Sequence, residues 1–155
     1  MKQFRVYADT SVYGGCFDDE FAPESRAFFE AIRRGRFKLV MSPSVLAELQ
    51  RVPERVRRIV VDLPEHGIEM IDFTEEVGRL REAYLEAGIL GREHQADAEH
   101  IAFASVAEVD FVVSWNFKHI VQFDKIAGYQ AVNLLNGYRE VRIYSPKEVV
   151  ANEEE

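Results

Sequence analysis

The apolar residues of this chain fall into short strand-like runs that alternate with longer segments of helical periodicity. Strands of this kind, separated by helices, are typical of a parallel sheet with helices on both faces. We therefore predict a three-layer α/β/α sandwich around a central, mainly parallel sheet of four to five strands. The predicted strands are Phe4–Ala8, Phe37–Met41, Ile68–Ile71, Phe111–Ser114 and Val141–Tyr144.

The segments between these runs have the spacing and the terminal residues of helices. Gly14 and Gly15 instead predict a turn-rich connection after the first strand. Residues 1–150 contain no linker and are predicted to form a single domain, and residues 151–155 a disordered acidic tail. The predicted helices are Pro23–Arg34, Ser42–Val52, Pro53–Leu63, Thr74–Ala87, Gln95–Glu108 and Phe117–Leu135, the last interrupted near Gly128.

The composition excludes several classes of protein. The 155 residues suffice for a buried core without disulfides. The only cysteine, Cys16, leaves neither an internal disulfide nor a cysteine-based zinc site possible. The chain has no apolar stretch of the ~20 residues that cross a bilayer, and its first residues lack the apolar run of a secretory signal. We expect a cytoplasmic protein with no membrane contact.

The net charge of −8 argues at first against a nucleic-acid ligand. The charge is uneven, however, because residues 1–58 carry 11 Lys and Arg against 8 Asp and Glu, a net charge of +3. Two basic clusters, Arg33–Lys38 and Arg51–Arg58, are either ordinary solvated faces or contacts to a phosphate backbone, which needs only a local positive surface. The candidate RNA contacts are Arg33, Arg34, Arg51 and Arg55.

Two polar residues follow predicted strands directly. Asp9 comes after Phe4–Ala8, and Asn116 comes shortly after Phe111–Ser114. The carboxyl ends of parallel strands meet at one edge of the sheet, where ligands collect. Each residue has an alternative role, because Asp and Asn are also good N-caps for a following helix.

Two further acids lie on the apolar faces of predicted helices. Glu48 is flanked at helical spacing by Val45 and Leu49, and Asp97 shares its face with Ile101. A carboxylate on such a face is costly unless a charge or a donor compensates it. The alternatives are a Glu48 that reaches solvent from the edge of the stripe and an Asp97 that stabilises the first turn of its helix.

These positions predict that three carboxylates and one amide oxygen converge in one crevice. Carboxylates held that close repel one another, and a divalent cation removes the conflict. A set of hard oxygen ligands with no cysteine favours Mg²⁺ or Mn²⁺ over zinc. Such ions polarise a phosphodiester and activate a bound water.

Four segments around these residues resemble the four motifs of PIN-domain nucleases, in the order and at the spacing of that family, and the resemblance covers about residues 4–145. The segments are Tyr7–Ser11, Ser44–Leu49, Asp97–Ala102 and Val113–His119. The resemblance implies a parallel sheet with flanking helices and an endoribonuclease that uses Mg²⁺ or Mn²⁺. It implies further that Asp9, Glu48 and Asp97 are catalytic metal ligands.

The same resemblance implies supporting roles and partners. Thr10 and Ser114 would be hydroxyls that position water or hold the metal ligands. Many prokaryotic members of the family are VapC-type toxins that a small antitoxin protein inhibits, and many form homodimers. We therefore expect this chain to belong to a toxin–antitoxin system. Its expected partners are a small antitoxin protein and a second copy of the chain in a homodimer, beside the RNA substrate.

The fourth motif departs from the family, which usually has Asp where this sequence has Asn116. An amide oxygen can still bind a metal or a water, but it brings no charge, so a second ion should bind less tightly. The alternative function is a PIN-fold binding or scaffold protein that is weakly active or inactive.

The spacing of His94, Asp97 and His100 drifts around a helix, so this trio does not favour a zinc site. His119, which follows Trp115 and Asn116, has two alternative roles, a contact to a phosphate and a structural hydrogen bond, and we expect the hydrogen bond.

Overall fold

The computed structural model describes residues 2–150, which contain a parallel sheet of five strands in the order β3-β2-β1-β4-β5. Every neighbouring pair of strands is parallel. The predicted α/β fold with a central parallel sheet is therefore confirmed. The strands are β1 (Phe4–Ala8), β2 (Phe37–Met41), β3 (Ile68–Met70), β4 (Phe111–Val113) and β5 (Ile143–Tyr144).

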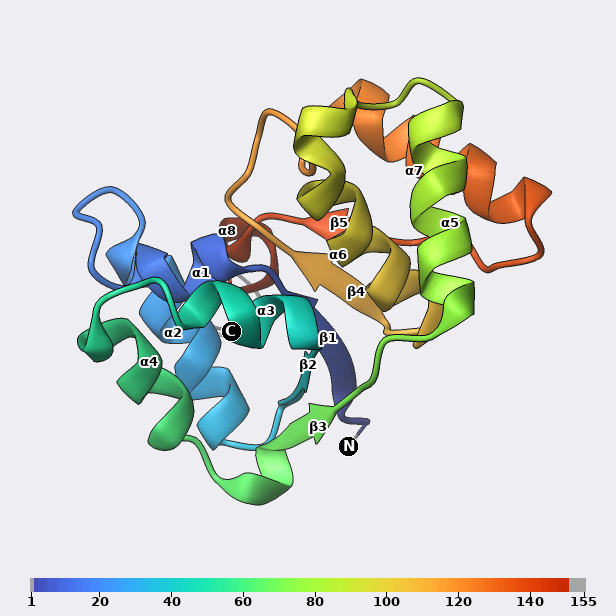
Figure 1. Cartoon of the computed structure of the whole chain (residues 1–155). Helices are drawn as coiled ribbons and strands as arrows, with labels where there is room; N and C mark the ends of the chain where they lie inside the picture. Colours follow the sequence, from blue (N-terminus) through green and yellow to red (C-terminus); the bar gives the residue numbers. More distant parts are fainter. Residues whose placement is uncertain (1, 151–155) are drawn as a thin grey trace.

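Helices cover both faces of the sheet, and Figure 1 shows α5, α6 and α7 grouped on one side, with α1, α2 and α8 on the other. The helices are α1 (Thr10–Gly15), α2 (Ala22–Arg33), α3 (Pro43–Leu49), α4 (Glu54–Val61), α5 (Glu75–Glu86), α6 (Gln95–Val106), α7 (Phe123–Leu135) and α8 (Pro146–Val150). Two short 3₁₀ helices, η1 (Glu65–Gly67) and η2 (Arg92–His94), precede β3 and α6.

The alternation of side chains along β1 explains the two layers. Phe4 faces α2, where its ring lies 6.5 Å from Phe37, which in turn lies 5.7 Å from Phe28 of α2. Tyr7 faces the opposite layer, with its ring 5.7 Å from that of His100 in α6. Both faces of the central strand are thus buried, as its apolar sequence predicts.

Two of the predicted helix starts are confirmed by their caps. The Ser42 hydroxyl accepts a hydrogen bond from the Val45 N–H at 3.2 Å, and the Thr74 hydroxyl accepts one from Val77 at 3.3 Å. These caps satisfy N–H groups that the first turn of a helix leaves without partners. The cap at Ser42 fixes the start of α3 immediately after β2, and α3 carries Glu48.

The glycines after the first strand do not form the predicted turn. Gly14 and Gly15 are helical and complete α1. A Cβ atom on Gly15 would lie 2.4 Å from the Ser25 hydroxyl and 2.9 Å from Trp115 Nε1, so glycine is required there for close packing. The sequence pattern does not distinguish this reason from a turn.

The later part of the chain differs from the prediction in two ways. The helix predicted to span Phe117–Leu135 begins only at Phe123, and it continues without a break through Gly128. A Cβ atom on Gly128 would lie 2.9 Å from Ile89, so this glycine also permits a close approach. The short helix α8 was not predicted.

No helix of the described part of the chain is long and apolar enough to cross a membrane. Residues 151–155, predicted to be a disordered tail, lie outside the described residues.

Candidate functional site

Asp9 occupies the cap position of α1 but does not cap it, because its side chain accepts no hydrogen bond from the backbone N–H groups of the first turn. Its carboxylate instead accepts hydrogen bonds from the hydroxyl of Ser11 at 2.5 Å and from that of Ser114 at 2.9 Å. Ser114 follows β4, the neighbour of β1, so two strand ends jointly hold this acid. Asp9 is 5% exposed. The structure therefore favours a buried carboxylate at the sheet edge over the capping role.

Glu48 faces the same edge from α3, and its side chain is 32% exposed. The Thr10 hydroxyl donates a hydrogen bond to it, and Nε2 of His100 lies 3.0 and 3.1 Å from its two oxygens. Burial raises the pKa of Glu48, but the hydrogen bond and charge of His100 outweigh burial, so its pKa is below the ordinary value. Glu48 is therefore held in its ionised form.

His100 is the residue of the site that the sequence analysis missed. It is 2% exposed and joins Glu48 to the Tyr7 hydroxyl, which lies 2.6 Å from Nδ1. The Tyr7 hydroxyl also lies 2.7 Å from the hydroxyl of Ser42. Burial lowers the pKa of His100, but the hydrogen bond and charge of Glu48 raise it above its ordinary value. The signal in the sequence was its position three residues after Asp97, which places both on one helix face.

Asp97 lies in the first turn of α6, partly buried. The pKa of Asp97 is raised above its ordinary value, mainly by burial and to a smaller extent by the charge of Glu48. The charges of His100, His119 and His94 oppose this increase. Burial likewise raises the pKa of Asp9, and the charge of Asp97 adds to that increase. Asp97 thus interacts through its charge with both of the other predicted acids, Asp9 and Glu48.

Asn116 does not cap the following helix, which begins at Phe123, but its side chain caps a turn at residues 117–120 instead. Its amide oxygen accepts hydrogen bonds from the N–H groups of Lys118 at 3.2 Å and His119 at 2.9 Å, and its own N–H donates to the Ser114 hydroxyl at 2.9 Å. A carbonyl oxygen has two lone pairs, so these bonds use its capacity as an acceptor. Asn116 therefore shapes the turn that carries His119.

The four candidate RNA contacts divide between the two edges of the sheet. Arg33 and Arg34 lie where α2 ends, before β2 begins, and pair with Glu30 at 3.3 and 3.5 Å. They are therefore at the edge opposite the acids. Arg51 follows α3 and lies close enough to lower the pKa of Glu48, and Arg55 lies 4.9 Å from the ring centre of Phe17.

A pair of histidines adjoins Asp97. The rings of His94 and His119 are stacked, with centres 3.8 Å apart and planes at 27°. Each offers a ligand atom, and these atoms and one from Asp97 all lie within 4.8 Å of one another. Burial and the charge of His94 lower the pKa of His119. Sequence spacing relates His94 to His100 and not to His119, because the contact depends on the turn after β4, which returns to this point.

The carboxylates of the acidic edge suit a divalent cation by their chemistry, whereas the ligand atoms that all lie within 4.8 Å of one another in the described part of the chain belong to His94, Asp97 and His119. Asp9 and Asp97 have raised pKa values because burial and neighbouring charge oppose their ionisation. A divalent cation bound to these carboxylates would lower both pKa values, because its positive charge stabilises the ionised forms. Carboxylate oxygens are also the ligands that Mg²⁺ and Mn²⁺ prefer. Asp9, Glu48 and Asp97 are the residues that would hold it.

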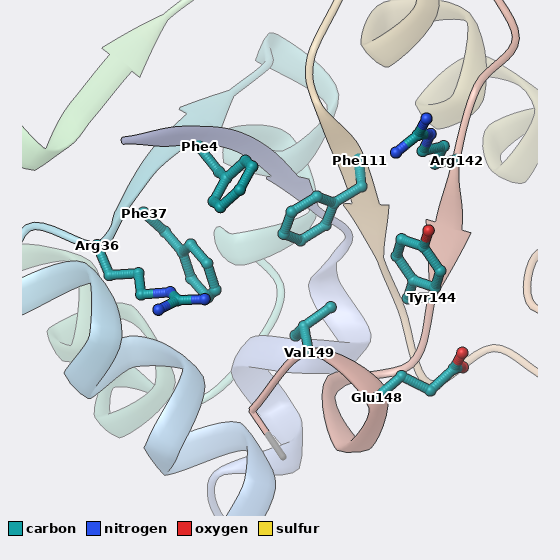
Figure 2. Close-up of a pocket in the computed structure, with 8 residues that line it drawn as sticks. All are labelled: Phe4, Arg36, Phe37, Phe111, Arg142, Tyr144, Glu148 and Val149. Carbon is teal, nitrogen blue, oxygen red and sulfur yellow. The ribbon is translucent and has the colours of Figure 1, made fainter. Parts of the chain in front are cut away.

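A separate pocket of about 370 Å³ lies at the opposite edge of the sheet. Figure 2 shows the rings of Phe4, Phe37 and Phe111, each the first residue of its strand, beside Val149 of α8. None of the acids described above lines this pocket, so we do not assign it to the candidate site.

Comparison with known proteins identifies a shared fold. No protein-family model matches the chain, and no curated protein matches it. Among solved structures, a chain in the crystal structure of VapBC2 from Rickettsia felis, bound to a DNA fragment from their promoter, aligns with a TM-score of 0.56 and 16% sequence identity. The alignment covers 91% of this chain and 98% of that chain. At this identity, the likeness shows that the two chains share one α/β fold.

Proposed function

We propose that this chain is a divalent-metal-dependent endoribonuclease in which Asp9, Glu48 and Asp97 hold Mg²⁺ or Mn²⁺. The observation that carries the proposal is that Asp97 of α6 interacts through its charge both with Asp9, at the end of β1, and with Glu48 of α3. Two of them have raised pKa values, and their mutual repulsion has no evident use in a purely structural site. The resemblance of the four segments to PIN-domain nucleases supports the same function.

The chain's own residues have distinct tasks in this mechanism. Ser11 and Ser114 hold the two oxygens of Asp9 in fixed directions. His100 keeps Glu48 ionised, and Glu48 would bind the metal directly or accept a hydrogen bond from the attacking water. A bound divalent ion would supply polarisation of the phosphodiester and a lower pKa for water. Thr10, which donates to Glu48, limits the orientations of that carboxylate.

RNA would approach along the surface of α3 and α4. Arg51 lies beside Glu48, and Arg55 lies nearby in the chain, at the start of α4. Arginine contacts to phosphate would offset the repulsion between an acidic site and a polyanion. We therefore retain Arg51 and Arg55 as RNA contacts and drop Arg33 and Arg34, which lie at the other edge.

We further propose that the chain acts as the toxin of a toxin–antitoxin pair and that a small antitoxin protein blocks the acidic edge. The shared fold with a VapBC2 chain and the resemblance to VapC-type toxins support this partner. Co-expression with the product of an adjacent small gene tests it: a stable complex with suppressed RNA cleavage is expected, whereas cleavage unaffected by any adjacent gene product contradicts it.

A cleavage assay tests the nuclease proposal. End-labelled single-stranded RNA is incubated with the protein over a range of Mg²⁺ and Mn²⁺ concentrations, and with Asp9→Ala beside the control Asp19→Asn, a loop aspartate that is exposed. We expect metal-dependent cleavage by the wild type and the control and none by Asp9→Ala. Full activity of Asp9→Ala, or cleavage that chelators do not stop, contradicts the proposal.

The second candidate function is a binding module that no longer cuts RNA. The observation that favours it is Asn116, whose amide oxygen is committed to the turn and adds no charge. The variant Asn116→Asp keeps an acceptor for the two backbone N–H groups and adds a carboxylate. RNA binding without cleavage by the wild type, with cleavage appearing in Asn116→Asp, would establish the binding module.

A further inference from the structure

Two histidines from distant parts of the chain meet beside Asp97. His94 ends η2 immediately before α6, and His119 lies in the turn after β4. Their rings stack at 3.8 Å, and one potential ligand atom from each lies within 4.8 Å of the others and of an Asp97 oxygen. All three residues are partly exposed, so an ion and its water ligands could reach them.

Other groups hold the two histidine backbones in place. The His119 N–H donates to the Asn116 amide at 2.9 Å, and its carbonyl accepts a hydrogen bond from the Tyr129 hydroxyl at 2.8 Å. The His94 N–H donates to the Gly91 carbonyl at 3.0 Å. The surrounding structure therefore fixes the backbone positions from which both imidazoles project, while the rings themselves can turn.

We propose that His94, Asp97 and His119 form a second cation site that selects a first-row transition-metal ion such as Zn²⁺ over Mg²⁺. Neutral imidazole is a good ligand for Zn²⁺, whereas Mg²⁺ prefers carboxylate and water oxygens. Two imidazoles and one carboxylate form a common catalytic zinc set that leaves further positions for water.

Binding requires a small movement of the rings. Zn²⁺ bonds to nitrogen and oxygen are about 2.0–2.2 Å long, so the three ligand atoms must draw closer than their present limit of 4.8 Å. The stacked rings must also open, because each lone pair lies in the plane of its ring. Both side chains are partly exposed and can turn. The exposed Glu93, 3.7 Å from His94 Nε2, is a weak competitor for that ring.

The second site rests on the proposed function only through Asp97, which would contribute one oxygen to each ion. A shared carboxylate holds two ions about 3.5–4 Å apart in two-metal sites that cleave phosphodiesters. Imidazoles at this position would then provide metal ligands where Asn116 provides no carboxylate, although neutral imidazoles add no negative charge. Binding of the ion, however, can be measured without RNA.

Titration of the metal-free protein with Zn²⁺ and Mg²⁺ by calorimetry, and with Co²⁺ by visible absorption, tests the site. The variants are His94→Ala, His119→Ala and the control His66→Ala, an exposed histidine in η1. We expect the wild type and the control to bind Zn²⁺ more tightly than Mg²⁺. Each of the other variants should bind Zn²⁺ at least about tenfold more weakly and lose the Co²⁺ absorption, because even residues that only support a ligand change affinity about 10–100-fold.

Nuclear magnetic resonance of the imidazole nitrogens in the wild type provides a readout that does not depend on a variant's folding. Zn²⁺ should shift the resonances of His94 and His119 and leave His66 unchanged. Equal Zn²⁺ affinity in all four proteins, or shifts confined to other histidines, overturns the proposal. Site-specific Zn²⁺ binding without RNA cleavage would refute the proposed nuclease and leave this site standing. Mg²⁺-dependent cleavage, together with Zn²⁺ binding that neither histidine variant weakens, would support the nuclease and refute the second site.

Discussion

Asp9 stands in an Asp-Thr-Ser sequence that suits a helix cap and a metal ligand equally well. The structure separates the two roles, because the carboxylate bonds to Ser11 and Ser114 and leaves the helix uncapped. At this scale the acids could be predicted from strand ends and helix faces. The spacing of His100 after Asp97 places it on the same helix face, but its bond to Glu48 joins residues 52 positions apart, and no local pattern reports such a contact.

Replacing Asp9 with Asn should separate stability from activity. The raised pKa of Asp9 means that the fold opposes its negative charge. The neutral, isosteric amide should therefore leave the metal-free protein as stable or more stable, while RNA cleavage falls at least about a hundredfold because a metal ligand is lost. Thermal unfolding in EDTA and cleavage rates measure both. A clear loss of stability in EDTA would show that Asp9 is a structural residue.

His100→Gln should change the pH dependence of stability. The pKa of His100 in the folded protein is raised above its ordinary value of 6.5, so its contribution is fully present below that value and is lost as pH rises through the higher, folded-state pKa. The free energy of unfolding of the metal-free wild type should thus fall above pH 6.5, and the variant should lose this part of the slope. Chemical denaturation between pH 6 and 9 measures it. Identical slopes in the two proteins would contradict a charged His100–Glu48 pair.

At the scale of elements, the strand positions could be predicted closely because buried parallel strands are short apolar runs. Glycine was the main source of error. Gly15 and Gly128 both lie inside helices, where each makes room for a neighbouring side chain. A single sequence does not show which neighbour packs against a glycine. A glycine that permits close packing inside a helix therefore cannot be distinguished from one that ends or interrupts the helix. The sequence likewise predicts helix for the turn after β4, which brings His119 close to Asp97.

Gly15→Ala and Gly14→Ala form a matched pair that tests the packing of α1. A Cβ atom at position 15 would collide with Ser25 and Trp115, whose Nε1 donates to the Ser25 hydroxyl at 2.7 Å. Such overpacking should cost about 1–3 kcal/mol. Position 14 has nothing within 4 Å of a Cβ atom, so alanine there should be neutral or stabilise by up to about 1 kcal/mol. Urea unfolding compares them, and equal effects would refute the packing argument.

At the scale of the whole molecule, the parallel sheet separates two kinds of surface. Its carboxyl edge gathers Asp9, Glu48 and Asp97, and its amino edge carries the aromatic pocket of Figure 2. The sequence predicts acids at the carboxyl edge because parallel strands place all their carboxyl ends there, but it does not predict the aromatic pocket. It did not predict the histidine pair, which depends on how the turn after β4 folds back over α6.

The account depends most on the claim that the three acids hold a divalent ion. Electron paramagnetic resonance of Mn²⁺ titrated into the metal-free protein measures this directly, with Asp9→Asn and the exposed control Asp19→Asn. We predict saturable binding by the wild type and the control, and binding at least about tenfold weaker in Asp9→Asn. Mn²⁺ binding that is absent from the wild type, or equally tight in all three proteins, would contradict the account.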